Sequence, residues 1–340
     1  MEKKKIAAIL YAFLAAVFYA VNMPMSKLLL QKIEPTFMAS FLYLGAGIGI
    51  GLVYLFGKSQ RKNEDKLSKE DLPYTIGMIV LDIAAPIFLM IGLTSATSAN
   101  ASLLNNFEIV ATSVIALFVF KEVISPRLWV AIALITLASI LLSFEDISGF
   151  RFSLGSLFIL AAAVCWGFEN NFTRKISSKN TYQIVMLKGI FSGMGSFIIA
   201  LVLKEKFPQM QYIAYALLLG FVAYGLSIFL YVRAQKELGA AKTSAYYAVA
   251  PFVGALLSFV ILKEAITENY IAALLIMVAG SALVVYDTLM MRHAHLHTHT
   301  VAHTHGGSTH THTVEHVHEH RHWISDEKHT HRHRDKKDGE

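Results

Sequence analysis

The stretches Lys121-Glu122-Val123-Ile124-Ser125 and Lys263-Glu264-Ala265-Ile266-Thr267 are nearly the same sequence, and they begin 142 residues apart. Each stretch ends one long apolar segment and is followed by another apolar segment of similar length. Self-similarity at a fixed spacing indicates a duplicated architecture. In a hydrophobic chain it predicts a bundle of membrane helices made of two related halves.

The composition agrees with a membrane protein. Hydrophobic residues make up 55% of the 340 residues, charged residues make up 16%, and the mean hydropathy is +0.50. Ordinary soluble domains are less apolar and carry more charge. Ten apolar runs each approach the roughly 20 residues that a helix needs to cross the hydrocarbon core. The runs are 6–27, 36–56, 73–93, 98–120, 127–143, 153–173, 181–203, 211–232, 240–262 and 269–288.

The number of runs fixes the expected topology. Five spans per half is an odd number, so the second half must enter the membrane inverted relative to the first. We therefore predict an all-α integral membrane protein of ten transmembrane helices, arranged as two inverted five-helix repeats over residues 1–146 and 147–291. If the N-terminus is inside, the inner connections carry sixteen Lys and Arg residues and the outer ones six. The positive-inside rule then predicts a plasma-membrane protein, embedded in the lipid bilayer, with both termini cytoplasmic.

A second internal match carries a family resemblance. Residues 16–22 followed by Lys27 resemble residues 163–169 followed by Arg174 and Lys175. Besides this match, the resemblance is carried by Trp166-Gly167, the small-residue run 94–102, residues 238–241, Pro251 and the two Lys-Glu ends. On these features, residues 1–288 resemble the EamA-type branch of the drug/metabolite transporter superfamily. The resemblance implies ten helices in two repeats and a transport function. One departure is Asn105-Asn106-Phe107-Glu108, which stands where that family favours a proline.

Four charged residues fall inside the predicted spans: Asp82, Glu108, Glu169 and Lys188. A charge facing lipid at the bilayer centre costs about 2.5–3.5 kcal/mol on insertion scales, so we expect all four to face the bundle interior. Residues 101, 105, 108 and 112 follow helical spacing and form one polar stripe on the fourth span. The predicted residues for binding substrate or a coupling ion are Glu108, Asn105, Glu169, Asn22, Asp82, Asn170 and Lys188.

Several of these residues also have a purely structural interpretation. Lys188 could neutralise Glu169 or Glu108 in a buried ion pair that fixes the helix register. Asp82 is a weaker candidate than Glu108, because only the nearby Pro86 distinguishes its span. The glycines at 45, 47, 49 and 51 are expected to serve close helix packing.

The last segment, residues 292–340, is rich in histidine. All fifteen histidines of the chain lie between His293 and His333, and ten pairs have the pattern His-x-His. A chain with this spacing can offer three or four imidazoles to one ion, and imidazole suits zinc, nickel, cobalt and copper. Without metal the tail is expected to be disordered and cytoplasmic. The predicted metal ligands are His293, His295, His297, His299, His316, His318, His320 and His322.

Three functions are compatible with this sequence. The first is a secondary transporter, specifically an exporter of a small metabolite or cation that works by alternating access and is coupled to a proton or another ion. The second is an exporter of divalent nickel, cobalt or zinc fed by the tail. The third is a membrane-anchored metal buffer or sensor that does not transport. The patterns of an enzyme, a required cofactor or a nucleic-acid-binding surface are not apparent, and a homodimer is left open.

Overall fold

The structure is a computed structural model that describes residues 2–56, 65–121, 124–146, 151–177, 179–238, 243, 246–305 and 308–323. The chain divides into two compact units, a helical bundle over Met1–Val285 and a tail unit over Tyr286–Glu340. Two boundaries were predicted, one between the repeats at residues 146 and 147 and one between the second repeat and the tail at residue 291. Neither coincides with this division. The predicted repeat boundaries therefore stay predictions.

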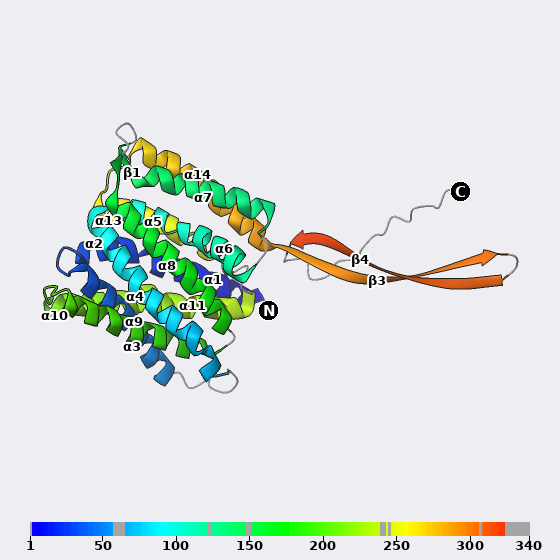
Figure 1. The fold of residues 1–340 in the computed structure, drawn as a ribbon, viewed down its shortest axis with the longest axis horizontal. Helices are drawn as coiled ribbons and strands as arrows, with labels where there is room; N and C mark the ends of the chain where they lie inside the picture. Colours follow the sequence, from blue (N-terminus) through cyan, green and yellow to red (C-terminus); the bar gives the residue numbers. More distant parts are fainter. Residues whose placement is uncertain are drawn as a thin grey trace. The chain divides into compact units, whose positions relative to one another are not determined.

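The first half of the bundle is helical along almost all of its described length (Figure 1). Its elements are α1 (Glu2–Ala20), α2 (Asn22–Leu29), α3 (Pro35–Phe56), the 3₁₀ turn η1 (Lys69–Asp71), α4 (Leu72–Ser95), α5 (Ser98–Leu104), α6 (Phe107–Phe120) and α7 (Pro126–Ser143). Two short strands, β1 (Phe144–Asp146) and β2 (Arg151–Phe152), pair antiparallel where the first half passes into the second.

The second half is also helical along almost all of its described length. Its elements are α8 (Leu154–Ile176), α9 (Thr181–Val202), α10 (Met210–Gly220), the π-helical segment η2 (Phe221–Leu226), α11 (Ser227–Leu238), α13 (Ala250–Leu262) and α14 (Glu268–Leu289). Eight helical segments of the described chain are long and apolar enough to cross a membrane. The other two predicted spans correspond to α8, which carries three charged residues near its end, and to α13, which has 13 residues.

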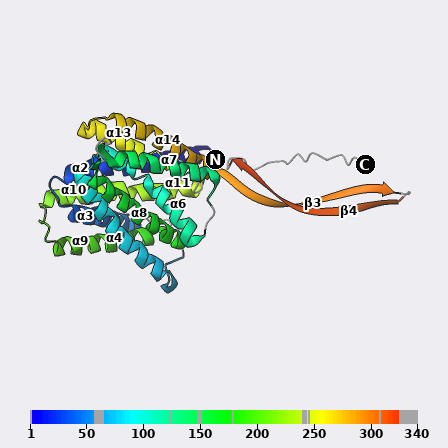
Figure 2. The same cartoon turned by 45° about the horizontal axis from the view of Figure 1, so that its top comes forward.

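Helices of one half pack mainly against helices of the other half. The most extensive contacts join α4 to α8, α3 to α9 and α1 to α11, and the paired helices lie side by side in Figures 1 and 2. Small residues allow the close approaches, as predicted for the glycines of α3. A Cβ atom on Gly47 would lie 2.7 Å from the backbone nitrogen of Ile190, and one on Gly45 would lie 2.1 Å from the carbonyl oxygen of Leu217. These glycines therefore fix how closely the halves can pack.

Several of the spans are interrupted near their middle. The first span breaks at Val21, between α1 and α2, and the fourth breaks at Asn105-Asn106, between α5 and α6. At the second break the backbone N–H of Asn106 bonds to Leu103 O at 3.0 Å and that of Glu108 bonds to Asn105 O at 3.1 Å, both with three-residue spacing. The backbone thus tightens locally without a proline, because Asn side chains compete for backbone groups.

The described part of the tail unit forms two strands, and the disorder expected of the tail without metal stays a prediction. Strands β3 (Met290–His305) and β4 (Ser308–Trp323) pair as one antiparallel hairpin, in a register that sets His293 opposite His320 and His297 opposite His316. One sequence feature accounts for the strands. The alternation of His with Thr and Val has the two-residue period of a strand.

Candidate functional site

Three of the four predicted intramembrane charges meet at the interface of the halves. Lys188 of α9 places its Nζ atom 3.1 Å from Oδ2 of Asp82 on α4 and 3.0 Å from Oε1 of Glu169 on α8. Tyr43 of α3 donates its hydroxyl hydrogen to Oδ1 of Asp82 at 2.9 Å. We call Asp82, Glu169 and Lys188 the charge cluster. It joins α4 of the first half to α8 and α9 of the second.

The two carboxyl groups of the charge cluster are buried, and Lys188 is partly buried. The side chains of Asp82 and Glu169 are 0% and 2% exposed, and that of Lys188 is 20% exposed. Glu169 also accepts a hydrogen bond from the hydroxyl of Thr173, one turn further along α8. The sequence is compatible with an ion pair of Lys188 with Glu169 or with Glu108. The pair with Glu169 is present, and the second partner of Lys188 is Asp82 in place of Glu108. Asp82 therefore shares Lys188 with Glu169, and its predicted rank below Glu108 as a site residue stays a prediction.

Glu108 lies in a neighbouring group of amides and hydroxyls. Asn170 of α8 donates from Nδ2 to Oε1 of Glu108 at 2.6 Å and to Oγ1 of Thr112 at 3.3 Å. The adjacent Asn171 donates to the carbonyl oxygen of Thr112 at 3.1 Å. Glu108 and Thr112 of the predicted polar stripe thus face α8, and Glu108 is a third carboxylate next to the charge cluster.

Tyrosines connect the charge cluster to the first span. Trp166 Nε1 donates to the Tyr43 hydroxyl at 3.3 Å, and the Tyr43 ring lies 5.5 Å from the ring of Tyr224 in η2, between centroids. Asn22 donates from Nδ2 to the Tyr224 hydroxyl at 3.1 Å and accepts from Ser26 at 3.0 Å. The structure therefore places Asn22 beside this aromatic row and not on the charge cluster.

A small cavity lies where the breaks of the first and fourth spans approach α13. Its lining includes Tyr19, Ser102, Asn105 and Pro251. Asn105 donates from Nδ2 to the Tyr19 hydroxyl at 3.0 Å, whereas its Oδ1 atom and the Ser102 hydroxyl have no hydrogen-bond partner in the structure. A buried polar atom without a partner costs free energy, and this cavity of about 10 Å³ is just large enough for one water molecule to satisfy it.

Sequence reasoning missed the tyrosines of the site. Tyr19, Tyr43 and Tyr224 each contact a predicted polar residue, yet aromatic side chains in membrane helices usually pack or anchor at the interface. A signal was available, because a tyrosine hydroxyl buried in hydrocarbon needs a hydrogen-bond partner. Such residues in the same spans as buried acids and amides are therefore candidates for the same network.

The arrangement is suited to binding a proton or a cation. Asp82, Glu169 and Glu108 supply three carboxyl groups and Lys188 supplies one ammonium group. An ammonium between two carboxylates balances one negative charge, and uncompensated buried charge is expensive. Within the described part of the chain, no three His, Cys, Asp or Glu side chains are grouped as metal ligands would be. The tail histidines lie outside the part of the structure whose side chains are described, so their metal binding stays a prediction.

The chain matches known transporters over most of its length. The profile of the EamA-like transporter family matches twice, over residues 6–144 and over residues 153–286. Proteins named as uncharacterized transporters are similar to the chain. One from Methanothermobacter thermautotrophicus is 24% identical over 269 residues, which cover 74% of this chain and 78% of that protein. One from Clostridium kluyveri is 25% identical over 292 residues, covering 81% and 91%.

A solved structure has the same fold. The crystal structure of a protein superimposes with a TM-score of 0.58 and covers 83% of this chain and 96% of that chain, at 18% sequence identity. At this identity the likeness concerns the fold alone.

Proposed function

The chain belongs to the EamA-like transporter family, and from that premise we propose that it is a secondary transporter that works by alternating access between two inverted five-helix repeats. The twofold match of the family profile supports the repeat, and the preference of each half for packing on the other supports movement between halves. Inverted repeats are a common plan of secondary transporters, whose binding sites lie near the bilayer midplane between the repeats.

The observation that carries the proposal is the charge cluster. Lys188 pairs with Glu169 inside the second half and with Asp82 of the first half, so the pair with Asp82 joins groups that must shift relative to one another when the halves move. Charges of this kind inside a membrane are functional by default, because their cost is otherwise unrewarded. We assign Asp82, Glu169 and Lys188 to binding of the coupling ion, for which the proton is the simplest choice.

Glu108 and Asn105 would contact the cargo. Both belong to the interrupted fourth span, where the helix break and the unpartnered Asn105 oxygen favour a polar ligand. Carboxylate and amide oxygens are suited to an organic amine or another cation. The direction that we propose is export, with the cargo taken from the cytoplasm, where the excess of inner Lys and Arg residues places both termini.

A second candidate is export of nickel, cobalt or zinc, and the His-rich tail favours it. Its fifteen histidines could collect metal at the cytoplasmic mouth. The oxygen-rich interior is a weaker match, because these metals prefer nitrogen or sulfur ligands. A third candidate is a metal buffer or sensor anchored by the bundle, which would bind metal without moving it. Family membership favours transport over both this role and catalysis.

Cellular metal content separates these candidates. Cells loaded with nickel, cobalt or zinc would express the intact chain, a Glu108→Gln variant, or a chain stopped after Arg292, and Glu268→Gln serves as a control because Glu268 is exposed. A metal exporter lowers the content of one metal, and only Glu108→Gln abolishes the effect. If no metal changes while the purified tail binds ions, metal is not the cargo, and organic amines and amino acids are tested next.

A further inference from the structure

A repeated backbone feature lies at three helix ends. Lys121, Lys204 and Lys263 have φ values of 55°, 58° and 53°, and they are the residues other than glycine with positive φ in the described part of the chain. Each ends an apolar helix, and the next residue in the sequence is a glutamate. A residue with a Cβ atom adopts this conformation only when its surroundings enforce it. The contacts of the following glutamates supply a reason.

Two of these glutamates hold the start of a helix in the other half. Glu264 accepts hydrogen bonds from the backbone N–H groups of Ser98 at 2.7 Å and Ala99 at 2.8 Å, one on each carboxylate oxygen. Glu205 accepts in the same way from Thr36 at 3.0 Å and Phe37 at 2.9 Å. A carboxylate at a helix start satisfies free N–H groups and complements the helix dipole. Glu122, the third glutamate, is outside the described residues.

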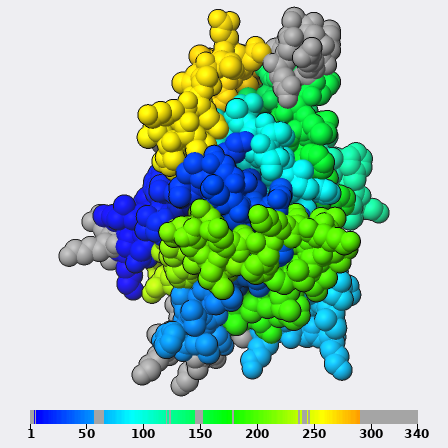
Figure 3. All heavy atoms as spheres, turned by 90° about the vertical axis from the view of Figure 1, so that its left-hand side faces the viewer, coloured from blue at the N-terminus to red at the C-terminus, as the bar shows by residue number. Residues whose placement is uncertain are grey.

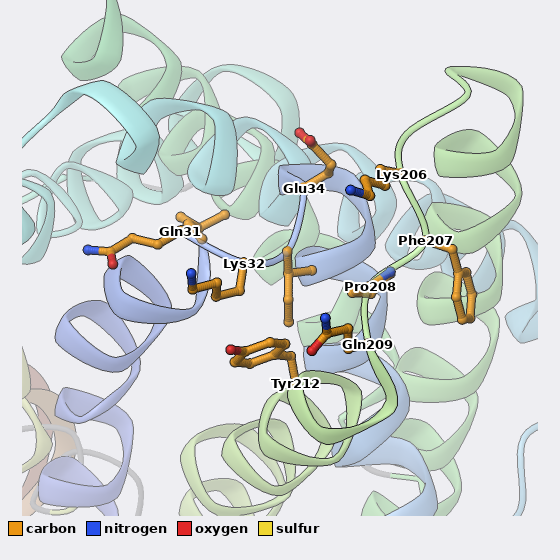
Figure 4. Close-up of a pocket in the computed structure, with 10 residues that line it drawn as sticks. Gln31, Lys32, Glu34, Lys206, Phe207, Pro208, Gln209 and Tyr212 are labelled. Carbon is orange, nitrogen blue, oxygen red and sulfur yellow. The ribbon is translucent and has the colours of Figure 1, made fainter.

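Both contacts lie on the same end of the bundle, which we call the distal face and define by the connections 30–34, 96–97, 203–209 and 263–267. Figure 3 looks onto this face, where residues of the first half, in blue, lie between the green α9–α10 region and the yellow α13–α14 region. Figure 4 shows a cleft on this face whose lining includes Lys32 and Glu34 of the first half and Lys206 and Gln209 of the second. The two halves meet here through polar groups.

The connection before α5 is held from two sides. Lys27 of α2 donates from Nζ to the carbonyl oxygens of Leu93 at 2.6 Å and Ala96 at 2.8 Å, at the end of α4. Glu264 binds the start of α5 immediately afterwards. At the same residue, the hydroxyl of Ser98 lies 2.8 Å from that of Ser258 on α13. Below this point is the small cavity with Ser102 and Asn105.

We propose that Glu264 and Glu205 form a gate that closes the distal end of the transport path. The proposal rests on alternating access as the proposed function and adds the residues that hold one end closed. Each carboxylate spans the two halves, so a movement that parts the halves at this face must break both pairs of charge-assisted hydrogen bonds. The bonds stabilise the closed state and not the open state, and their removal shifts the population toward opening.

A static helix cap is the competing interpretation. In that case the carboxylates stabilise α3 and α5 equally in every state, and their removal would lower stability without changing access to the interior. Access is therefore the quantity to measure.

The test uses cysteine labelling. Ser102, which is 2% exposed and lies beneath the gate, is replaced by Cys in a Cys165→Ala background, since Cys165 is the single native cysteine. A membrane-impermeant methanethiosulfonate reagent is applied to one side of the membrane. That side is chosen as the one from which the reagent labels Gln209→Cys, an exposed position on the distal face. Labelling rates are compared for the native gate, Glu264→Ala, Glu205→Ala, both together, and Glu268→Ala, an exposed carboxylate four residues from Glu264.

We expect Glu264→Ala to raise the labelling rate of Ser102→Cys by at least about tenfold, and the double variant to raise it further. Glu268→Ala should leave the rate unchanged. Variants are compared only if they are monodisperse in detergent. If Glu264→Ala is not, Glu264→Gln replaces it. The amide oxygen of this variant accepts from only one N–H group, so a smaller increase in the labelling rate is expected. Equal rates in all variants, or an equal increase in Glu268→Ala, would overturn the gate.

Labelling needs no cargo and no ion gradient, so the two proposals fail separately. Unchanged labelling together with measured transport removes the gate and leaves the transporter. Increased labelling in a protein that moves no cargo removes the transport function and leaves a gated bundle.

Discussion

Replacement of Lys188 by Met tests whether the charge cluster is a closed electrostatic unit. Lys188→Met keeps an apolar side chain of similar length but leaves Asp82 and Glu169, at 0% and 2% exposure, without their cation. Removal of one partner from a buried ion pair costs about 3–5 kcal/mol. A loss of 1 kcal/mol lowers the Tm of a chain of 150–250 residues by about 2–4 °C. Because this chain of 340 residues is longer, the lower figure of about 2 °C per kcal/mol applies, and we expect the Tm of Lys188→Met to fall by roughly 6–10 °C.

The control is the removal of all three charges. A triple variant with Asp82→Asn, Glu169→Gln and Lys188→Met leaves no uncompensated charge in the cluster, and we expect most of the lost Tm to return, because neutral replacement of buried ion pairs is often tolerated. Lys179→Met is the matched surface change. Its Nζ lies 3.7 Å from Asp71 on an accessible pair, and exposed pairs contribute about 0–1 kcal/mol.

The assay is thermal unfolding in detergent, followed by the loss of the monodisperse peak on size exclusion after heating. Two results would refute the reasoning. One is a Lys188→Met variant as stable as the native protein, and the other is a triple variant that is no more stable than Lys188→Met. Either result would mean that the carboxyl groups of the cluster are not held as charges by Lys188.

Three further outcomes are expected. Gly47→Ala should lower the Tm, because its Cβ would lie 2.7 Å from a backbone nitrogen of α9. Gly51→Ala should be neutral or stabilising, since its Cβ would meet only a methionine side chain at 3.6 Å. The same heating assay checks both variants, and equal effects would refute the packing argument. Glu108→Gln should keep the Tm within about 2 °C, because its amide oxygen can still accept from Asn170, while cargo flux in liposomes is lost; retained flux would remove Glu108 from the site. A chain stopped after Arg292 should lose nickel and zinc binding by titration calorimetry and keep the Tm of the bundle, and undiminished binding would place the metal sites elsewhere.

The spans and the charged residues could be predicted because hydrocarbon makes them conspicuous. Against a background of apolar runs, Asp82, Glu108, Glu169 and Lys188 were the residues that needed an explanation, and all four lie inside the bundle. Which acid paired with which cation could not be predicted. That choice depends on how α4, α8 and α9 are rotated against one another, and a single sequence does not contain this information.

Three features of the structure were not predicted: the break of the fourth span, the strands of the tail and the contacts of Glu205 and Glu264. Asn105-Asn106 interrupts the fourth span by three-residue hydrogen bonds, a result that the missing proline did not suggest. The tail was expected to be disordered from its polar composition, yet its two-residue alternation also fits the antiparallel pairing of β3 with β4. The hydrogen bonds of Glu205 and Glu264 to the other half join residues 165–169 positions apart, a range at which short sequence patterns carry no information.

The most direct test of the central claim is proton-coupled flux across liposomes that contain the purified protein and a trapped pH-sensitive dye. Nickel, cobalt, zinc, organic amines and amino acids are added outside in turn, and the internal pH is followed. We predict that at least one class drives a change in internal pH, that Glu169→Gln abolishes it, and that Glu268→Gln does not. A response that persists in Glu169→Gln, or no response to any cargo class, would contradict coupled transport through the charge cluster.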